Sequence, residues 1–184
     1  MLGYYLLHLA NQLKIAMRSV IKLLLVLIIP IQSFAQDTVK LKRQAEATAN
    51  AVIKKDFETV ANHTYPKILK AAGGREKMIQ MIKLGMQEMQ VRGFTLDNAT
   101  VGSPGKFYKA GKEIHCLLPE MVVIKSNNSR LVNHTNLLAI SKDGGNFWYF
   151  LDINQSNYKM IPKIFPNFNK NLIIPAPSRP GLQQ

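Results

Sequence analysis

The chain has 184 residues, which is enough for one domain with a substantial hydrophobic core. Its formal net charge of +13 favours acidic partners such as an anionic membrane surface or envelope polyanions, but the basic residues are dispersed and form no nucleic-acid-binding motif. The single cysteine, Cys116, excludes an intrachain disulfide and lies in an apolar run, which is typical of a small buried side chain.

Residues 17–35 have the three parts of a secretory signal peptide: a short cationic start, an apolar core at residues 23–31, and small residues ending at Ala35. The apolar core is shorter than the ~20 residues that a membrane-spanning helix needs. We therefore expect cleavage after Ala35, no stable membrane span afterwards, and a periplasmic or secreted location. An uncleaved anchor is the alternative.

Residues 1–16 precede this leader, and we interpret them as an extension produced by a start codon assigned upstream of Met17. The leader is bacterial in character. We expect residues 36–165 to form a single domain and residues 166–184 to form a Pro-rich C-terminal tail that packs once, through residues 172–174, before it frays.

The first half of the predicted domain has helical periodicity. Residues 37–55 contain no Gly or Pro, and Leu41, Ala45, Thr48, Ala49 and Val52 share one helical face. Asp56 is placed to cap a new helical start, and Pro66 suits the first helical position of a short helix that Gly73 ends.

A methionine-rich helix is predicted over residues 74–92, ended by Gly93. Methionines spaced three residues apart can hold cuprous copper, but no His or Cys lies nearby in sequence, so we expect neither a metal site nor a cofactor. The thioethers instead indicate an irregular core or an adaptable pocket wall. The predicted buried stripe consists of Met78, Ile79, Ile82, Met86 and Met89, widened by Met81 and Leu84.

After Gly93 the apolar residues no longer recur with a helical period but alternate with a period of two residues or form continuous runs. Strands are predicted over residues 94–101, 130–141 and 146–153. Between the first two, a second strand region covers residues 107–108 and 113–118 around a break at Gly111 and resumes at 121–124, with a bulge or an edge position near Pro119. The strands over 130–141 and 146–153 form a hairpin around an Asp-Gly-Gly turn. Helices followed by antiparallel strands predict an α+β fold, with N-terminal helices packed on a curved sheet of about four to five strands.

The turn of this hairpin, Ser141-x-Asp143-x-Gly145-x-x-Trp148, resembles the Asp-box hairpin of sialidase-type propellers. A propeller needs several copies and a longer chain. We therefore expect a structural role: Asp143 accepts backbone N–H bonds, Gly145 adopts a positive φ, and Trp148 packs beneath the loop.

The order of elements over residues 37–153, three helices and then a bent antiparallel sheet, resembles the nuclear-transport-factor-2-like (cystatin-like) cone fold. That superfamily includes isomerases, dehydratases and cyclases as well as non-catalytic binding modules. The fold alone therefore decides no function. The superfamily's isomerase pattern, one Tyr and two acids, does not map onto this chain residue by residue.

Four titratable residues are candidates for acid–base chemistry: Asp152, His115, His134 and Tyr65. Asp152 shares a strand face with Trp148 and Phe150, which would place it at a pocket mouth. For each of the four, an ordinary structural role is the competing interpretation. The chain has none of the nucleotide, metalloprotease or serine-hydrolase motifs.

Three functional hypotheses follow. The first is an exported, non-catalytic domain that binds a small apolar ligand or a protein partner in a pocket lined by Met78, Ile82, Met86, Met89, Trp148 and Phe150. The second is a cofactor-free lyase, isomerase or hydrolase that uses Asp152 with a His or Tyr. The third is an envelope protein whose basic surface binds polyanions. A homodimer is compatible with each.

Overall fold

The structure is a computed structural model, and it describes residues 32–126, 129–177 and 181–182. The predicted extension at residues 1–16 and most of the predicted signal peptide lie outside these residues. By its internal contacts the chain divides into Met1–Gln36 and Asp37–Gln184, and the fold described below is that of the second unit.

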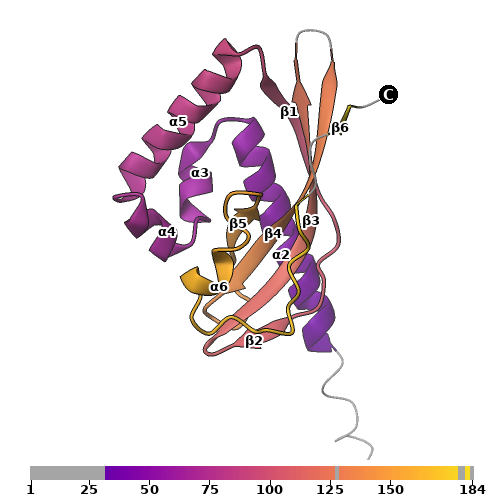
Figure 1. Cartoon of the computed structure of the whole chain (residues 1–184). Helices are drawn as coiled ribbons and strands as arrows, with labels where there is room; N and C mark the ends of the chain where they lie inside the picture. Colours follow the sequence, from indigo (N-terminus) through magenta and orange to yellow (C-terminus); the bar gives the residue numbers. More distant parts are fainter. Residues whose placement is uncertain (1–31, 127–128, 178–180, 183–184) are drawn as a thin grey trace, which may run out of the picture. The chain divides into compact units, whose positions relative to one another are not determined.

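Helices come first and strands follow, which confirms the α+β class (Figure 1). The helices α2 to α5 and the strands β1 to β5 are followed by a short helix α6 and a two-residue strand β6. Their bounds are α2 Gln32–Ile53, α3 Phe57–Asn62, α4 Pro66–Ala71, α5 Arg75–Val91, β1 Thr95–Val101, β2 Tyr108–Ala110, β3 Glu113–Lys125, β4 Arg130–Ser141, β5 Tyr149–Ile153, α6 Ile161–Ile164 and β6 Gly181–Leu182. Among the described helices, none is both long enough and apolar enough to cross a membrane.

The sheet is antiparallel, with the order β1-β3-β4-β5. The two long strands β3 and β4 form its centre and pair from Ile114↔Ser141 to Lys125↔Arg130. The far half of β3 pairs with β1 and its near half with β2, while β5 and β6 pair with opposite ends of β4. Each residue of β3 from Ile114 to Lys125 therefore has a defined neighbour on β4.

Pro119 lies inside β3, which continues through it without a break. Its carbonyl accepts a hydrogen bond from the Gly102 N–H at 2.8 Å, so the missing N–H faces the loop between β1 and β2, away from β4. At Pro119, this side of β3 pairs with neither β1 nor β2 and is locally an edge, where a missing N–H interrupts no strand pairing. The register irregularity lies instead in β1, between Leu96 and Asn98.

Helix α2 packs on one face of the sheet through small side chains. Leu41, Ala45 and Ala49 are buried there, because alanines allow the helix backbone to approach the strands closely. The sheet contributes the rest of this core cluster. Its main members are Val101, Cys116, Leu118, Leu137, Ala139, Trp148 and Phe150.

The turn before β5 has the structure that the sequence predicts. Asp143 Oδ1 accepts hydrogen bonds from the N–H groups of Asn146 and Phe147, both at 3.0 Å, and Gly145 has φ +96°. Trp148 is fully buried beneath the loop, and its Nε1–H donates to the Gly145 carbonyl at 3.0 Å. Helix α2 holds the turn in place, since the Gln44 side chain accepts the Trp148 N–H at 2.9 Å.

The outer edge of β5 is covered by the connection between α3 and α4. Phe150 donates its N–H to the His63 carbonyl at 2.7 Å, and Thr64 forms a parallel bridge with Phe150. Asp56 caps α3, accepting the Thr59 N–H at 3.2 Å, as its position in the sequence predicts. This connection places His63 beside the sheet.

The apolar face of helix α5 is less buried than the sequence predicts. Of its residues, all of which the structure describes, Ile79 alone is buried, while Met78, Ile82, Met86 and Met89 are half-buried. The reason is that α5 packs against α3, α4 and the start of β1 and not flat on the sheet. Met81 and Leu84 are 58% and 65% exposed.

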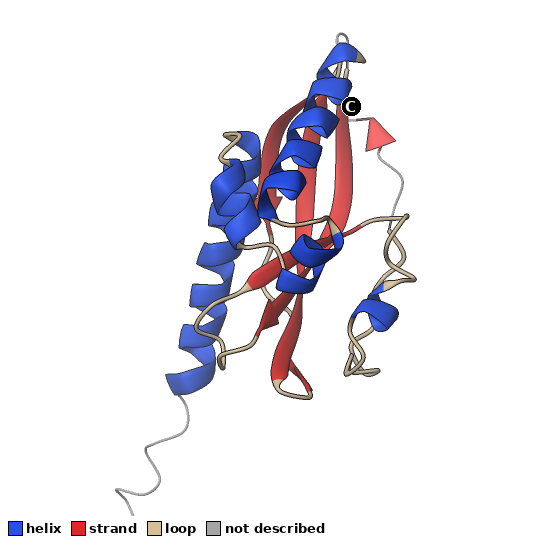
Figure 2. Ribbon diagram, turned by 90° about the vertical axis from the view of Figure 1, so that its left-hand side faces the viewer, coloured by secondary structure: helices blue, strands red, loops and turns tan. Residues whose placement is uncertain are grey.

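The other face of the sheet is covered by the C-terminal segment, residues 154–174. Ile161, Phe165 and Leu172 are buried against Leu138, Ile140 and Ile153. Figure 2 shows α2 and this segment on opposite sides of the strands. Leu172 packs as predicted for the tail, whereas Ile173 is 80% exposed.

Candidate functional site

A cavity of about 440 Å³ lies between helices α2, α3 and α5 and the α2-facing side of the sheet. Because α5 stands away from the strands, the space beneath it is not filled by side chains. The walls are mainly apolar. They include Ala49, Val52, Ile53, Val60, Met78, Met89, Leu96, Ala99, Val122, Ile124, Leu137 and Phe150.

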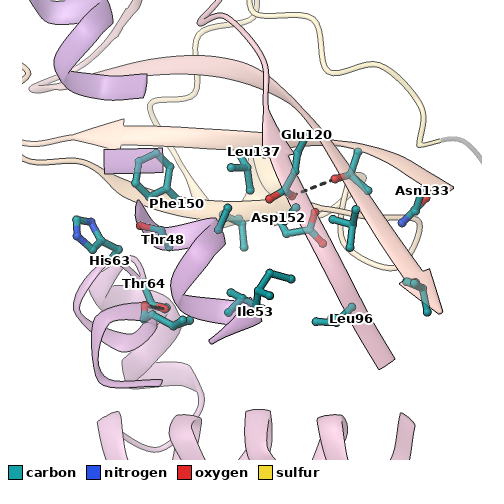
Figure 3. Close-up of a pocket in the computed structure, with 18 of the residues that line it drawn as sticks. Thr48, Ile53, His63, Thr64, Leu96, Glu120, Asn133, Leu137, Phe150 and Asp152 are labelled. Atoms are coloured by element: carbon teal, nitrogen blue, oxygen red, sulfur yellow. Dashed lines mark hydrogen bonds between the residues drawn. The ribbon is translucent and has the colours of Figure 1, made fainter. Parts of the chain in front are cut away.

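Two carboxylic acids project into this apolar space. Glu120 comes from β3 and Asp152 from β5, and Figure 3 shows them directed toward one another. The register explains their meeting: Glu120 pairs with Thr135 and Asp152 pairs with Leu137, two residues further along the same face of β4. Thr135 Oγ1 donates a hydrogen bond to Glu120 Oε2 at 3.2 Å.

Both acids hold their protons more tightly than usual. Burial raises the pKa of Glu120 to about 7; the nearby Asp152 adds to this increase, and the Thr135 hydrogen bond opposes it. Burial also raises the pKa of Asp152, while the Asn154 and Thr135 side chains act to lower it. The Asp152 side chain is nevertheless exposed, whereas that of Glu120 is half-buried, so burial affects Glu120 more strongly.

His63 lines the same cavity away from the acid pair, beyond Phe150 (Figure 3). Its Nδ1 lies 2.8 Å from the Trp148 carbonyl, which can only accept, so Nδ1 carries the proton and donates. The ring stacks on Phe147 with centroids 4.7 Å apart. In neutral His63 this leaves Nε2 as a hydrogen-bond acceptor.

The residues predicted to bind a ligand do not all line the same cavity. Met78, Met89 and Phe150 line the cavity, and Met86 lines a separate hollow of about 190 Å³ that it shares with Met89. Ile82 is half-buried and lines neither hollow. Trp148 does not line the cavity either, because it fills the core beneath the turn, against Phe107.

The predicted catalytic candidates lie on two faces of the sheet. Asp152 faces the cavity, whereas Tyr65 and His115 lie on the opposite face and are joined there by Glu113. The Tyr65 hydroxyl donates to Glu113 Oε1 at 2.7 Å, and His115 Nε2 lies 3.2 Å from Glu113 Oε2. Burial raises the pKa of Tyr65 and lowers that of His115.

His134 is exposed on β4, on the same face as Leu138 and Ile140. The structure therefore places Asp152 on the other face of the sheet from His115, His134 and Tyr65, and the acid beside it in the cavity is Glu120. Glu120 and His63 are not among the site residues that the sequence predicts. A lone acid within the apolar run of β3 was the available signal for Glu120; no local pattern marks His63.

Within the residues that the structure describes, no group of three or more His, Cys, Asp and Glu side chains is placed to hold a metal ion. The fold and cavity define an α+β domain with an apolar, acid-containing pocket. Comparisons with protein-family models, with curated proteins and with solved structures give no match.

Proposed function

We propose that the protein is an exported bacterial domain that binds a small apolar or amphipathic ligand, without catalysis, in the cavity beneath α5. The observation that carries the proposal is the apolar cavity of about 440 Å³, within the range of roughly 300–1,000 Å³ typical of small-molecule sites. The signal-peptide pattern of residues 17–35 supports export to the periplasm or the medium.

The composition of α5 also favours binding. Met78 and Met89 supply flexible, polarisable side chains to one wall, and a helix with little buried surface can move to fit ligands of different shape. The succession of helices and a sheet around a cavity supports membership of the nuclear-transport-factor-2-like superfamily, in which such pockets serve both binding proteins and enzymes.

The proposal is tested by filling the cavity. Ala99 lines it from β1, whereas the next residue, Thr100, is exposed. We expect Ala99→Phe to abolish binding of the neutral fluorescent probe N-phenyl-1-naphthylamine and Thr100→Phe to leave it unchanged. Equal probe binding by both variants would contradict the proposal. Native mass spectrometry of the protein from its host would identify a co-purifying small molecule or, as the alternative, a bound protein.

A second candidate function is cofactor-free proton transfer by a lyase, isomerase or hydrolase. Glu120, with a pKa of about 7, could take up and release a proton near neutral pH, as a general acid–base requires. Its test is deuterium exchange next to the carbonyl of a bicyclic ketone such as β-tetralone, followed by NMR in D₂O. Exchange that rises with a midpoint near pH 7 and disappears in Glu120→Gln would establish this activity, and a wild-type rate equal to that of Glu120→Gln would reject it.

A further inference from the structure

The charge of the cavity is opposite in sign to that of the chain. The sequence contains 24 Lys and Arg residues against 11 Asp and Glu. Among the described residues that line the cavity, however, Glu120 and Asp152 are the charged ones, and there is no Lys or Arg. Neither acid forms a salt bridge with a described residue. Negative charge in an apolar space is unfavourable until a proton or a bound cation neutralises it.

The polar end of the cavity also has more hydrogen-bond acceptors than donors. Each ionised carboxylate can accept about four hydrogen bonds. Glu120 receives one from Thr135, and Asp152 receives one from Asn154 at 3.3 Å. Asn133 also lines the cavity, and its Oδ1 is buried without a hydrogen-bond partner. A ligand head group that donates several hydrogen bonds would complement these acceptors.

These two requirements favour a cationic head group with several hydrogen-bond donors. A carboxylate or phosphate would be repelled and offers few donors or none, and a hydroxyl offers one donor without charge. A protonated primary amine offers three donors and the complementary charge. Resting on the ligand-binding function proposed above, we propose that the natural ligand is a lipophilic amine, with its ammonium group between Glu120 and Asp152 and its hydrocarbon body against the apolar walls.

The state of the acid pair makes this binding pH-dependent. An ammonium group favours the ionised form of Glu120, so the amine expels the proton that Glu120 holds. Because the pKa of Glu120 is about 7, its ionised fraction rises roughly tenfold between pH 6 and pH 8. Affinity for an amine that remains protonated over this range rises by up to the same factor.

The test uses three ligands with the same chain and different head groups: octylamine, 1-octanol and octanoate. Each is titrated against protein loaded with N-phenyl-1-naphthylamine, and displacement is followed by fluorescence at pH 6 and pH 8. The variants are Glu120→Gln and Asp152→Asn, with Glu76→Gln at the exposed start of α5 as the matched control. Their thermal unfolding verifies that each variant is folded.

We expect octylamine to bind about tenfold or more tightly than octanol, octanoate to bind least, and the preference for the amine to increase with pH. Glu120→Gln and Asp152→Asn should lose most of this preference while still binding octanol, and Glu76→Gln should retain it. Equal displacement by octylamine and octanol in the wild type, or stronger displacement by octanoate, overturns the amine inference and leaves the ligand-binding function standing. Failure of the probe and of all three compounds to bind overturns both.

Discussion

Glu120 is an acid within an apolar strand, and its elevated pKa makes the stability of the fold depend on pH. Its pKa is about 7 in the folded protein and 4.5 ordinarily, so between these values the folded chain holds a proton that the unfolded chain has released. The resulting stabilisation is fully present below pH 4.5 and is lost as the pH rises through 7.

Ionising the half-buried Glu120 carboxyl above pH 7 destabilises the folded state, and replacing Glu120 by the uncharged Gln removes this cost. We expect the free energy of unfolding of Glu120→Gln to exceed that of the wild type by about 1–3 kcal/mol at pH 8, and the two to agree near pH 4. Urea denaturation at both pH values measures the difference. A difference of the same size at both would show that the substitution acts through packing and not through the proton.

Asp143 stabilises the turn before β5 by accepting two backbone N–H groups and the Ser141 hydroxyl. Partial burial acts to raise its pKa, but hydrogen bonds from Phe147, Ser141 and Asn146 lower it overall. We expect Asp143→Ala to reduce the free energy of unfolding by about 1–2 kcal/mol at pH 7. This difference from the wild type should shrink as the pH falls through the pKa of Asp143, because the protonated carboxyl of the wild type accepts these hydrogen bonds less strongly.

Asp143→Asn is the matched control, since it keeps one acceptor oxygen and should lose less. If the alanine variant were as stable as the wild type, the hydrogen bonds of this turn would contribute nothing to folding.

For individual residues, the sequence predicts the contacts that form between near neighbours in the chain. The contacts of Asp143, Gly145 and Trp148 lie within a few residues, so their spacing was enough to predict the turn. The acid pair depends on the register that places β3 and β5 on either side of β4, and no short pattern contains that information. Trp148 was assigned to the pocket by alternation with Phe150, but β5 begins only at Tyr149.

Helix α5 shows what periodicity leaves undetermined at the scale of elements. Its apolar residues recur at helical spacing, and the helix lies where the sequence places it. The pattern identifies the apolar face without identifying what covers it, and here that face borders a cavity. Three of the predicted strands match the observed ones or differ from them only at their ends, because alternation and turn residues are signals within each strand. The strand region predicted at 107–124 is instead two antiparallel strands, β2 and β3, which are joined by a turn at Gly111.

Two glycines of this region allow a matched test of helix stability. Gly85 lies within α5 and Gly74 precedes it with φ +107°, and in both cases an added Cβ meets no atom within 4 Å. Space is therefore not the difference between them. We expect Gly85→Ala to stabilise the protein by about 0.5–1 kcal/mol, because alanine is the better helix former.

Gly74→Ala should instead destabilise the protein by about 1 kcal/mol or more, because an L-residue is strained at this φ. Chemical denaturation of the two variants measures both effects. A loss of stability in Gly85→Ala would indicate that α5 approaches another surface at this glycine.

At the scale of the molecule, both faces of the sheet are covered, and by segments from opposite ends of the sequence. Helix α2 covers one face, and residues 154–174 cover the other. The sequence predicts helices on one face and a tail at residues 166–184, since prolines and short apolar groups give no period. The apolar side chains of β4 on the second face, Leu138 and Ile140, were the sign that a second cover was required.

Truncation separates the structural part of the C-terminal segment from the rest. A chain ending at Ile174 keeps Ile161, Phe165 and Leu172, whereas a chain ending at Tyr158 loses all three and exposes the β4 side chains that they cover. We expect the product that ends at Ile174 to unfold cooperatively within a few degrees of the full chain, since among the described residues after 174 the paired strand that it loses is the two-residue β6.

The shorter product should bind an apolar dye and lose cooperative unfolding, because several large side chains that each contribute roughly 1.5–3 kcal/mol by burial are removed. Circular dichroism during heating, together with dye fluorescence, distinguishes the two products. Equal unfolding temperatures would mean that the contacts of α6 with the sheet do not stabilise the domain, and the second face would then have to be stable in water without them.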